Sequence, residues 1–343
     1  MKYRLLLLLE TLKSLFCLIF SRAKNRVILI GTPLHGNLGD HAIALSLCDL
    51  FNQNNIQFVE VLGAVYRKFP NIFASFITKT DTICICGGGF LGSLWTVEDD
   101  MVLSVLEKFK NNKIIIAPQS IFFYENDVAR IERTKTIYTN CKDLTVFLRE
   151  NNSYELCKIL FADMKIKIQK CPDIVFSLNF TTGIEKTREN KVLLCFRTDK
   201  EQVLSDFDEK LLKEKIVQKK LSFEEVSTVV PYAISSVARK REVLSILRKI
   251  ASSKLVITDR LHAMIFCYIT ETPCIVFDNI SRKVSGVYEW IKDCDYIRYC
   301  ATFDVEKIDF NLKGGKRKDF SIEFAPLLEE LGQCTKIQEA ENE

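Results

Sequence analysis

The stretch that most constrains the fold runs from Lys254 to Asn279, in the last third of the chain. An apolar run, 255–257, ends at Thr258 and Asp259, a helix-like segment follows directly, and a second apolar run closes the stretch. Strand, helix and strand within about 25 residues is the pattern of a parallel crossover unit. We therefore expect a parallel α/β sheet in this part of the chain.

Arg260 and His262 fall in the first turn of the helix in that unit. In open α/β sheets, ligands bind in the crevice where strands end and helices begin. A helix N-terminus favours anions, and the guanidinium fork of Arg260 suits a carboxylate or a phosphate. The alternative is structural: Asp259 caps the helix, Arg260 pairs with a surface carboxylate and His262 is a satisfied core residue.

The composition of the chain limits the classes of protein to which it can belong. A chain of 343 residues suits two domains of ordinary size. The net charge of +4, from 48 basic and 44 acidic residues, gives no electrostatic case for a nucleic-acid partner. The 13 cysteines include no CxxC pair, and several sit inside apolar runs, as small buried hydrophobes do in a reducing compartment such as the cytoplasm. We therefore expect neither a metal site nor a disulfide framework.

The N-terminal segment, 1–25, is very apolar, and we expect a helix from Lys2 to Phe20. Its uninterrupted apolar run, 5–9, is far too short to span a bilayer, which takes about 20 residues. One interpretation is an amphipathic helix that lies on an anionic membrane surface. The other is a helix packed across the first domain or against a partner chain. The flanking basic residues are Arg4, Arg22, Lys24 and Arg26.

A glycine-containing loop follows the first expected strand, 27–30. Its glycines let the backbone approach a ligand closely, although their spacing is not that of the dinucleotide-binding fingerprint. Asn37 or Asp40 could instead simply cap the next helix. The loop and the start of that helix also hold His35 and His41, two of the three histidines in the chain, and the third is His262.

Polar or glycine-rich groups also end the other strands expected in this half. Such groups follow strands 82–86, 113–117 and 144–148. In a parallel sheet these strand ends lie along one edge, so the groups converge on a single rim. That convergence is the strongest argument from the residues for a site, although the triple glycine alone could be a tight turn without a ligand. The groups are Gly87, Gly88 and Gly89, then Gln119 and Ser120, then Arg149.

The second half begins after a polar, glycine-containing segment, 181–191, which we take as a linker. Arg197 follows its first strand, 192–196, and Lys283 lies in the segment 281–286 that leads into a later helix, expected at about 287–291. A further strand at 226–230, a helix at 235–250 and a terminal helix at 320–337 are also predicted. The predicted division is a helix at 1–25, a first domain at 26–180, the linker, a second domain at 192–320, and a terminal helix and tail at 321–343.

Taken in order, these motifs resemble those of the polysaccharide pyruvyl transferases, enzymes that move the pyruvyl group of phosphoenolpyruvate onto a sugar as a ketal. The resemblance extends from about residue 26 to 292, and its pieces are specific only in combination. They are Asn37-Leu38-Gly39-Asp40-His41-Ala42-Ile43, Gly87-Gly88-Gly89-Phe90-Leu91, Ala117-Pro118-Gln119-Ser120, Arg149-Glu150 with Ser153, Pro172-Asp173, Arg197-Thr198-Asp199, Thr258-Asp259-Arg260-Leu261-His262, Pro273 to Asn279, and Lys283-Val284.

The resemblance implies a fold of two Rossmann-like domains that face each other across a cleft, as in the B-type glycosyltransferases. It implies that Arg260 and His262 bind phosphoenolpyruvate. The carboxylate and phosphate of this ligand also need fixed cations, for which Arg197 is the next candidate, while Lys283 is either a third cation or a surface lysine. His262 is the expected proton-transfer group, since imidazole titrates near neutral pH. No cofactor is implied.

The first domain would then hold the acceptor sugar, and Asp40 or His41 would take the proton of the attacking hydroxyl. Capsule and exopolysaccharide units are usually built on a polyprenyl lipid at the inner membrane face, which adds weight to the membrane-surface interpretation. Two rivals remain: a glycosyltransferase with a nucleotide-sugar donor, and a non-catalytic sugar-binding subunit of an assembly complex. The expected substrate-binding residues on the acceptor side are Asn37, Gly39, Gly87, Gly88, Gly89, Gln119, Ser120 and Arg149.

Overall fold

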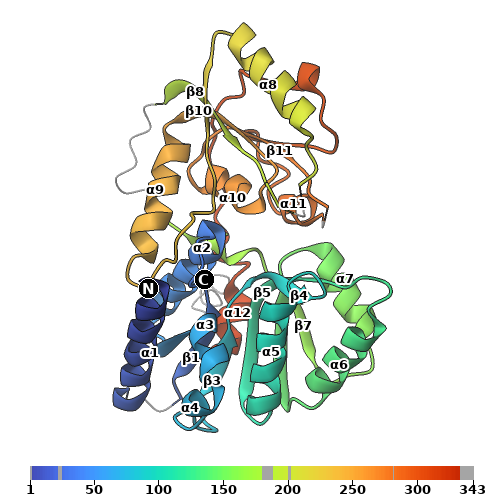
Figure 1. Ribbon diagram of the computed structural model, residues 1–343. Helices are drawn as coiled ribbons and strands as arrows, with labels where there is room; N and C mark the ends of the chain where they lie inside the picture. Colours follow the sequence, from blue (N-terminus) through green and yellow to red (C-terminus); the bar gives the residue numbers. More distant parts are fainter. Residues whose placement is uncertain (1, 22–24, 180–187, 200–201, 281, 333–343) are drawn as a thin grey trace, which may run out of the picture.

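The computed structural model describes residues 2–21, 25–179, 188–199, 202–280 and 282–332. These form two parallel β-sheets with helices around them, which confirms the α/β class (Figure 1). Most of the predicted linker, 181–187, and the tail from 333 onward lie outside the described residues, as do Arg22 and Lys24.

The first sheet has seven strands in the order β2-β1-β3-β5-β6-β7, with β4 paired to β5, and every pairing is parallel. Strands β1, β5 and β6 are almost completely buried, as expected where a sheet is covered on both faces, whereas the edge strand β7 is not. The seven strands are β1 (Val27–Thr32), β2 (Phe58–Leu62), β3 (Thr82–Ile85), β4 (Gly88–Gly92), β5 (Lys113–Phe122), β6 (Asp143–Leu148) and β7 (Lys167–Lys170).

The helices of this half are α2 (Leu38–Gln53), α3 (Gly63–Lys68), α4 (Pro70–Ala74), α5 (Thr96–Phe109), α6 (Val128–Thr139), α7 (Asn151–Leu160) and the 3₁₀ turn η1 (Ile174–Ser177). The predicted N-terminal helix is present as α1 (Lys2–Phe20), and it packs beside β2 on the outside of this half (Figure 1). Within the described part of the chain, no helix is both long enough and apolar enough to cross a membrane.

The second sheet has five parallel strands in the order β12-β11-β10-β8-β9. The unit at 254–279 forms its centre as β10, α10 and β11, as predicted. The strands are β8 (Glu189–Cys195), β9 (Ser222–Glu225), β10 (Ser253–Thr258), β11 (Cys274–Phe277) and β12 (Ile297–Cys300). The helices are α8 (Asp206–Gln218), α9 (Arg239–Ala251), α10 (Leu261–Ile269), α11 (Lys283–Tyr288), η2 (Val305–Lys307) and α12 (Ala325–Glu330).

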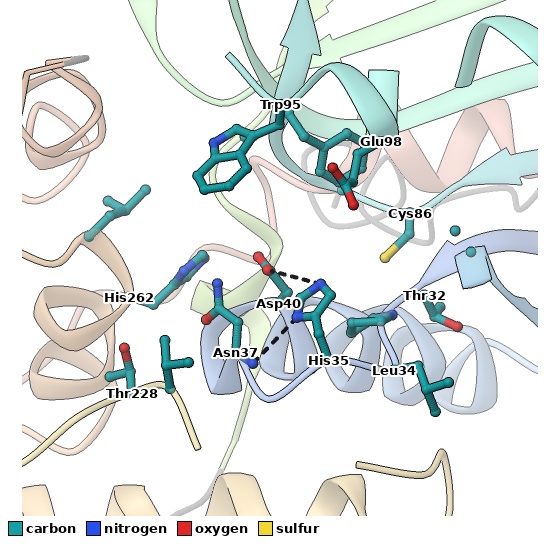
Figure 2. Close-up of a pocket in the computed structure, with 18 of the residues that line it drawn as sticks. Thr32, Leu34, His35, Asn37, Asp40, Cys86, Trp95, Glu98, Thr228 and His262 are labelled. Carbon is teal, nitrogen blue, oxygen red and sulfur yellow. Dashed lines mark hydrogen bonds and ion pairs between the residues drawn. The ribbon is translucent and has the colours of Figure 1, made fainter. Parts of the chain in front are cut away.

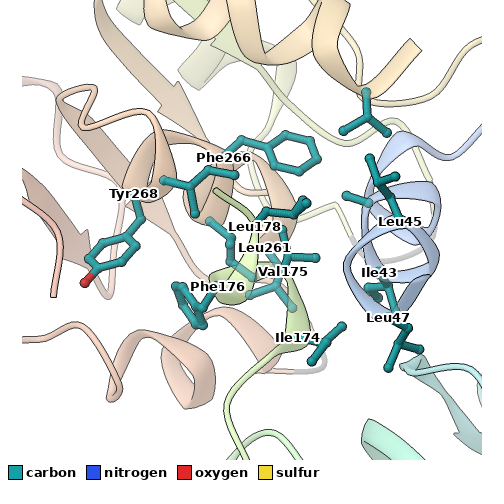
Figure 3. Close-up of a cluster of buried hydrophobic side chains, with 14 of the residues drawn as sticks. Ile43, Leu45, Leu47, Ile174, Val175, Phe176, Leu178, Leu261, Phe266 and Tyr268 are labelled. Carbon is teal, nitrogen blue, oxygen red and sulfur yellow. The ribbon is translucent and has the colours of Figure 1, made fainter. Parts of the chain in front are cut away.

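A continuous apolar cluster joins the two halves. Ile43 and Leu47 of α2 and Val175 of η1 share it with Leu261 and Phe266 of α10 (Figure 3). Burial of a Leu, Ile or Phe side chain contributes about 1.5–3 kcal/mol, so this cluster fixes how α10 sits against the first sheet. The position of α10 matters because it carries the predicted site.

Several predicted elements differ from the structure. The segment 226–230 does not form a strand of the sheet. The strand is β9, at 222–225, a largely exposed edge strand with few apolar residues. The triple glycine is not a turn, because Gly88 and Gly89 begin β4 beside β5. Strand β8 begins at Glu189, inside the predicted linker. In the described part of the predicted terminal helix, only 325–330 is helical, and its Glu330 pairs with Lys113 of the first sheet at 2.8 Å.

Candidate active site

A cavity of about 420 Å³ lies where the carboxyl ends of strands from both sheets meet. The loop between β1 and α2 forms one wall and the start of α10 forms another, while Trp95 and Glu98 lie opposite Asn37 (Figure 2). The predicted site residues that line it are Asn37, Asp40, Gly87, Gly89, Arg149, Arg197, Arg260, His262 and Lys283. The structure therefore brings most of the predicted site together from six separate stretches of the chain.

Arg260 is held at the N-terminus of α10 by neighbouring backbone and hydroxyl groups. Its backbone N–H donates to Oγ1 of Thr258 at 3.0 Å, and its Nε donates to the carbonyl of Phe196 at 3.1 Å. The residue is only 7% exposed, so its position is fixed by the fold. A guanidinium combined with a helix N-terminus favours binding of an anionic group.

His262 lies against a buried ion pair. Its Nε2 is 3.6 Å from Oδ2 of Asp173, and that oxygen accepts a hydrogen bond of 2.6 Å from Nη1 of Arg149. Burial alone would raise the pKa of Asp173, but the charge of Arg149, followed by His262, holds that pKa well below its ordinary value. Asp173 is therefore a carboxylate at neutral pH, and it lies beside one edge of the imidazole, beyond hydrogen-bond distance of Nε2.

A close backbone approach on the first-sheet side also positions His262. A Cβ atom at Gly39, in the first turn of α2, would lie 2.2 Å from Nδ1 of His262. Contacts this short do not occur in folded proteins, so a side chain at this position would displace the ring. Gly39 does not line the cavity, and its contribution is the space that it leaves for His262.

Two more cations reach the cavity from the second-sheet half. Arg197 makes two hydrogen bonds of 2.8 Å to the carboxylate of Asp199, and its backbone N–H donates to Asp259. Lys283 Nζ donates to the carbonyl of Gly89 at 3.0 Å, which connects α11 to β4 of the first sheet. Burial raises the pKa of Asp259, immediately before Arg260, to about 6.

The first-sheet wall of the cavity carries Asn37 and Asp40. Asn37 caps α2 by accepting a 3.0 Å hydrogen bond from the backbone N–H of Gly39. An oxygen of Asp40 lies 3.7 Å from Nε2 of His35, and both side chains are partly exposed (Figure 2). Asp40 is thus the candidate base on this wall.

Other predicted site residues lie away from the cavity lining. His41 is fully buried: its Nε2 is 2.7 Å from the carbonyl of His35, and Nε of Arg239 donates to its Nδ1 at 3.4 Å. Burial, and then the charge of Arg239, lowers the pKa of His41 to about 4, so it is neutral at pH 7. The prediction that His41 faces the acceptor is therefore corrected.

Gln119 and Ser120 are also buried, and neither they nor Gly88 line the cavity. Gln119 donates to the carbonyl of Cys86 at 2.9 Å, and Ser120 accepts from Nε of Arg149 at 2.9 Å. These residues lie behind the cavity wall, where Ser120 holds the side chain of Arg149 and Gln119 connects neighbouring strands. Their predicted direct role in substrate binding is therefore corrected.

The sequence reasoning missed some of the lining residues and the partner of His262. Asp173 follows the end of β7, so the rule that strand ends share an edge could have placed it near the site. Nothing in the sequence signalled Tyr3, because it comes from the N-terminal helix. Other lining residues that were missed include Arg67, Trp95, Glu98, Thr228 and Asn279. Among the described residues, no group of three or more histidine, cysteine, aspartate or glutamate side chains could hold a metal ion.

The fold and the cavity define an α/β protein with two parallel sheets and a cationic, histidine-containing site where their strand ends meet. The polysaccharide pyruvyl transferase family model matches residues 37–281. The chain belongs to that family, and the protein is accordingly a transferase.

Two relatives are similar to this chain in sequence, and one solved structure is similar to it in fold. General stress protein 30 of Bacillus subtilis is 33% identical over 89% of this chain and 91% of its own length. Pyruvyl transferase 1 of Schizosaccharomyces pombe is 25% identical over 79% of this chain and 71% of its own. A crystal structure of an uncharacterized Klebsiella pneumoniae protein shares the fold, with a TM-score of 0.59, 20% identity, and coverage of 88% of this chain and 99% of that one.

Proposed function

We propose that the protein transfers the pyruvyl group of phosphoenolpyruvate to two hydroxyls of a sugar and forms a cyclic ketal. The observation that carries this proposal is that one cavity holds Arg260, Arg197 and Lys283 together with His262. Phosphoenolpyruvate has a carboxylate and a phosphate, and both are bound best by fixed cations. Its reaction also needs a group that can transfer a proton, and His262 fits that requirement.

The proposed reaction has two additions at the same carbon. In the first, His262 gives a proton to C3 of the enol, and the oxygen of one sugar hydroxyl bonds to C2 while its own proton passes to Asp40. The C2–O bond to phosphate then breaks, and phosphate leaves with the electron pair. The second hydroxyl bonds to C2 and loses its proton, which completes the ketal. The products are the ketal and inorganic phosphate.

The two halves divide the substrates in this proposal. Residues 192–320 hold phosphoenolpyruvate and residues 26–180 hold the sugar, in an arrangement of two Rossmann-like domains across a cleft like that of B-type glycosyltransferases. Support comes from the lining of the cavity by both sheets and from the family match. The family also supports a role in capsule or exopolysaccharide synthesis, with the enzyme in the cytoplasm.

Thermal unfolding with and without phosphoenolpyruvate tests the donor assignment. A ligand at 100 times its dissociation constant stabilises a folded protein by about 2.7 kcal/mol, so we expect a clear rise in Tm for the wild type. Arg260→Gln should lose that rise while its far-UV circular dichroism stays unchanged. Arg133→Gln, which removes a half-exposed arginine outside the cavity, is the matched control and should keep the rise.

Two outcomes would replace the proposal. A rise in Tm with a nucleotide-sugar but not with phosphoenolpyruvate would indicate a glycosyltransferase. Binding of sugar without turnover of any donor would indicate a non-catalytic sugar-binding subunit.

A further inference from the structure

Helix α1 is packed with its polar side inward. The buried residues of the helix include Glu10, Thr11 and Ser14. Ser14 donates to the backbone carbonyl of Glu60 in β2 at 3.0 Å, and Glu10 accepts a 2.8 Å hydrogen bond from the backbone N–H of Ser236. The inward face is therefore held by specific hydrogen bonds to both halves of the protein, together with the two buried leucines Leu7 and Leu18.

The outward face of α1 is apolar instead. Seven large apolar side chains on it are each more than half exposed: Leu5, Leu8, Leu9, Leu12, Phe16, Ile19 and Phe20. Their spacing of three and four residues places them on a single stripe, opposite the buried face. Surface helices of globular proteins turn such a stripe toward the core. In the described part of the protein, nothing covers the stripe on α1, which lies along the outside of the molecule (Figure 1).

The charges on the outer surface of α1 have one sign. Lys2, Arg4 and Lys13 are exposed, and Lys13 also donates a 2.6 Å hydrogen bond to the hydroxyl of Ser236. Glu10, the one acidic residue of the helix, is only 4% exposed and accepts a hydrogen bond from the same hydroxyl. By helical spacing, Lys2 and Lys13 lie along one side of the apolar stripe and Arg4 lies on the other side. An apolar stripe bordered by basic side chains is the pattern of a helix that lies in the interface of an anionic bilayer.

We propose that the outward face of α1 binds the surface of an anionic lipid bilayer, with the helix in the plane of the headgroups. Anionic lipid matches the exposed basic residues, whereas a second copy of this face would offer them no acidic partner. This interaction goes beyond the transfer reaction. If the proposed function holds, it also places the acceptor wall near the bilayer, because Tyr3 of α1 lines the cavity.

Flotation of the full-length protein with lipid vesicles tests the proposal. We expect binding to phosphatidylcholine vesicles that contain about one third phosphatidylglycerol, and weaker binding to phosphatidylcholine alone. The double variant Leu8→Glu/Leu12→Glu should lose at least about tenfold of this binding. The matched control Ile159→Glu/Ile322→Glu adds the same charge at two positions that are 74% and 70% exposed outside α1, and it should bind like the wild type.

A second double variant tests the contribution of the basic side chains to vesicle binding. Lys2→Gln/Arg4→Gln should weaken binding to the anionic vesicles about fivefold for each charge removed and change binding to phosphatidylcholine much less. Equal binding by the wild type and the Leu8/Leu12 variant would overturn the proposal. It would also be overturned if the wild type were a dimer that the same variant dissociates, without any vesicle binding. The Tm shift with phosphoenolpyruvate, measured without vesicles, reports separately on the donor site.

Discussion

Two histidines occupy similar places in the two halves but have opposite surroundings. His41 lies in the first turns of α2, after β1, and His262 lies in the first turn of α10, after β10. His41 is fully buried beside the guanidinium of Arg239, whereas His262 lines the cavity with the carboxylate of Asp173 behind it. The comparison shows that the strand-to-helix connection places a histidine at the edge of each sheet. The neighbouring charge and the exposure of the imidazole then determine whether that histidine can contact a substrate.

The surroundings of His41 have a structural purpose. Arg239, on α9 of the second half, also pairs with the buried Glu60 of β2 in the first half. His41 thus belongs to a buried polar contact between the halves. His262 instead lines the cavity between them, where it exchanges a proton with the substrate in the reaction that we propose.

The largest effect should come from removing the carboxylate behind His262. Asp173→Ala leaves Arg149, only 2% exposed, without its buried partner, and breaking a buried ion pair costs about 3–5 kcal/mol. Urea unfolding should show this loss of stability. Asp100→Ala removes a half-exposed partner of Arg133 and should cost at most about 1 kcal/mol. Equal losses in the two variants would mean that the buried pair is not tightly coupled.

The acid stability of the fold tests the surroundings of His41. Its pKa is about 4 in the folded protein and 6.5 in the unfolded chain, so unfolding takes up a proton between these values. The free energy of unfolding should therefore fall as the pH drops from 6.5 to 4, by about 3 kcal/mol in total. His41→Gln should lack this contribution, and its stability relative to the wild type should improve toward pH 4.

The contribution of Asp259 to the free energy of unfolding has the opposite pH dependence. The wild type must therefore be compared with His41→Gln at each pH. The pKa of Asp259 is raised to about 6 in the folded state, so its contribution to stability falls as the pH rises from 3.8 to 6. The wild type and His41→Gln share the contribution of Asp259. The difference between their free energies of unfolding therefore reports on His41 alone. A difference that stays constant from pH 6.5 to 4 would contradict the assigned environment of His41.

A smaller effect should follow from a methyl group placed against His262. Gly39→Ala should displace the imidazole and lower turnover by about 10²-fold, because a misplacement of about 1 Å has that cost. The same substitution in a His262→Ala background should change turnover little. If the loss were equal in both backgrounds, Gly39 would be acting through the backbone of α2 and not through His262.

The sequence predicted the parallel sheets, the strand ends and nine of the residues that line the cavity, because the period of apolar runs and the parallel-sheet edge rule are local and general. It missed what depends on exact packing. The partnership of Asp173 with His262 joins residues about ninety positions apart, and no spacing rule relates them. The burial of His41 depends on Arg239, which lies in the other half. Edge strand β9 carries two glutamates and gave little apolar signal.

The central claim is that His262, and not His41, transfers the proton. The most direct measurement is the rate of phosphate release from phosphoenolpyruvate at pH 7, with an acceptor chosen from a panel of methyl glycosides, for His262→Gln and His41→Gln side by side. We expect a loss of about 10²–10⁴-fold for His262→Gln and a rate within a few-fold of the wild type for folded His41→Gln. Wild-type turnover in His262→Gln, or an equal loss in both variants, would contradict it.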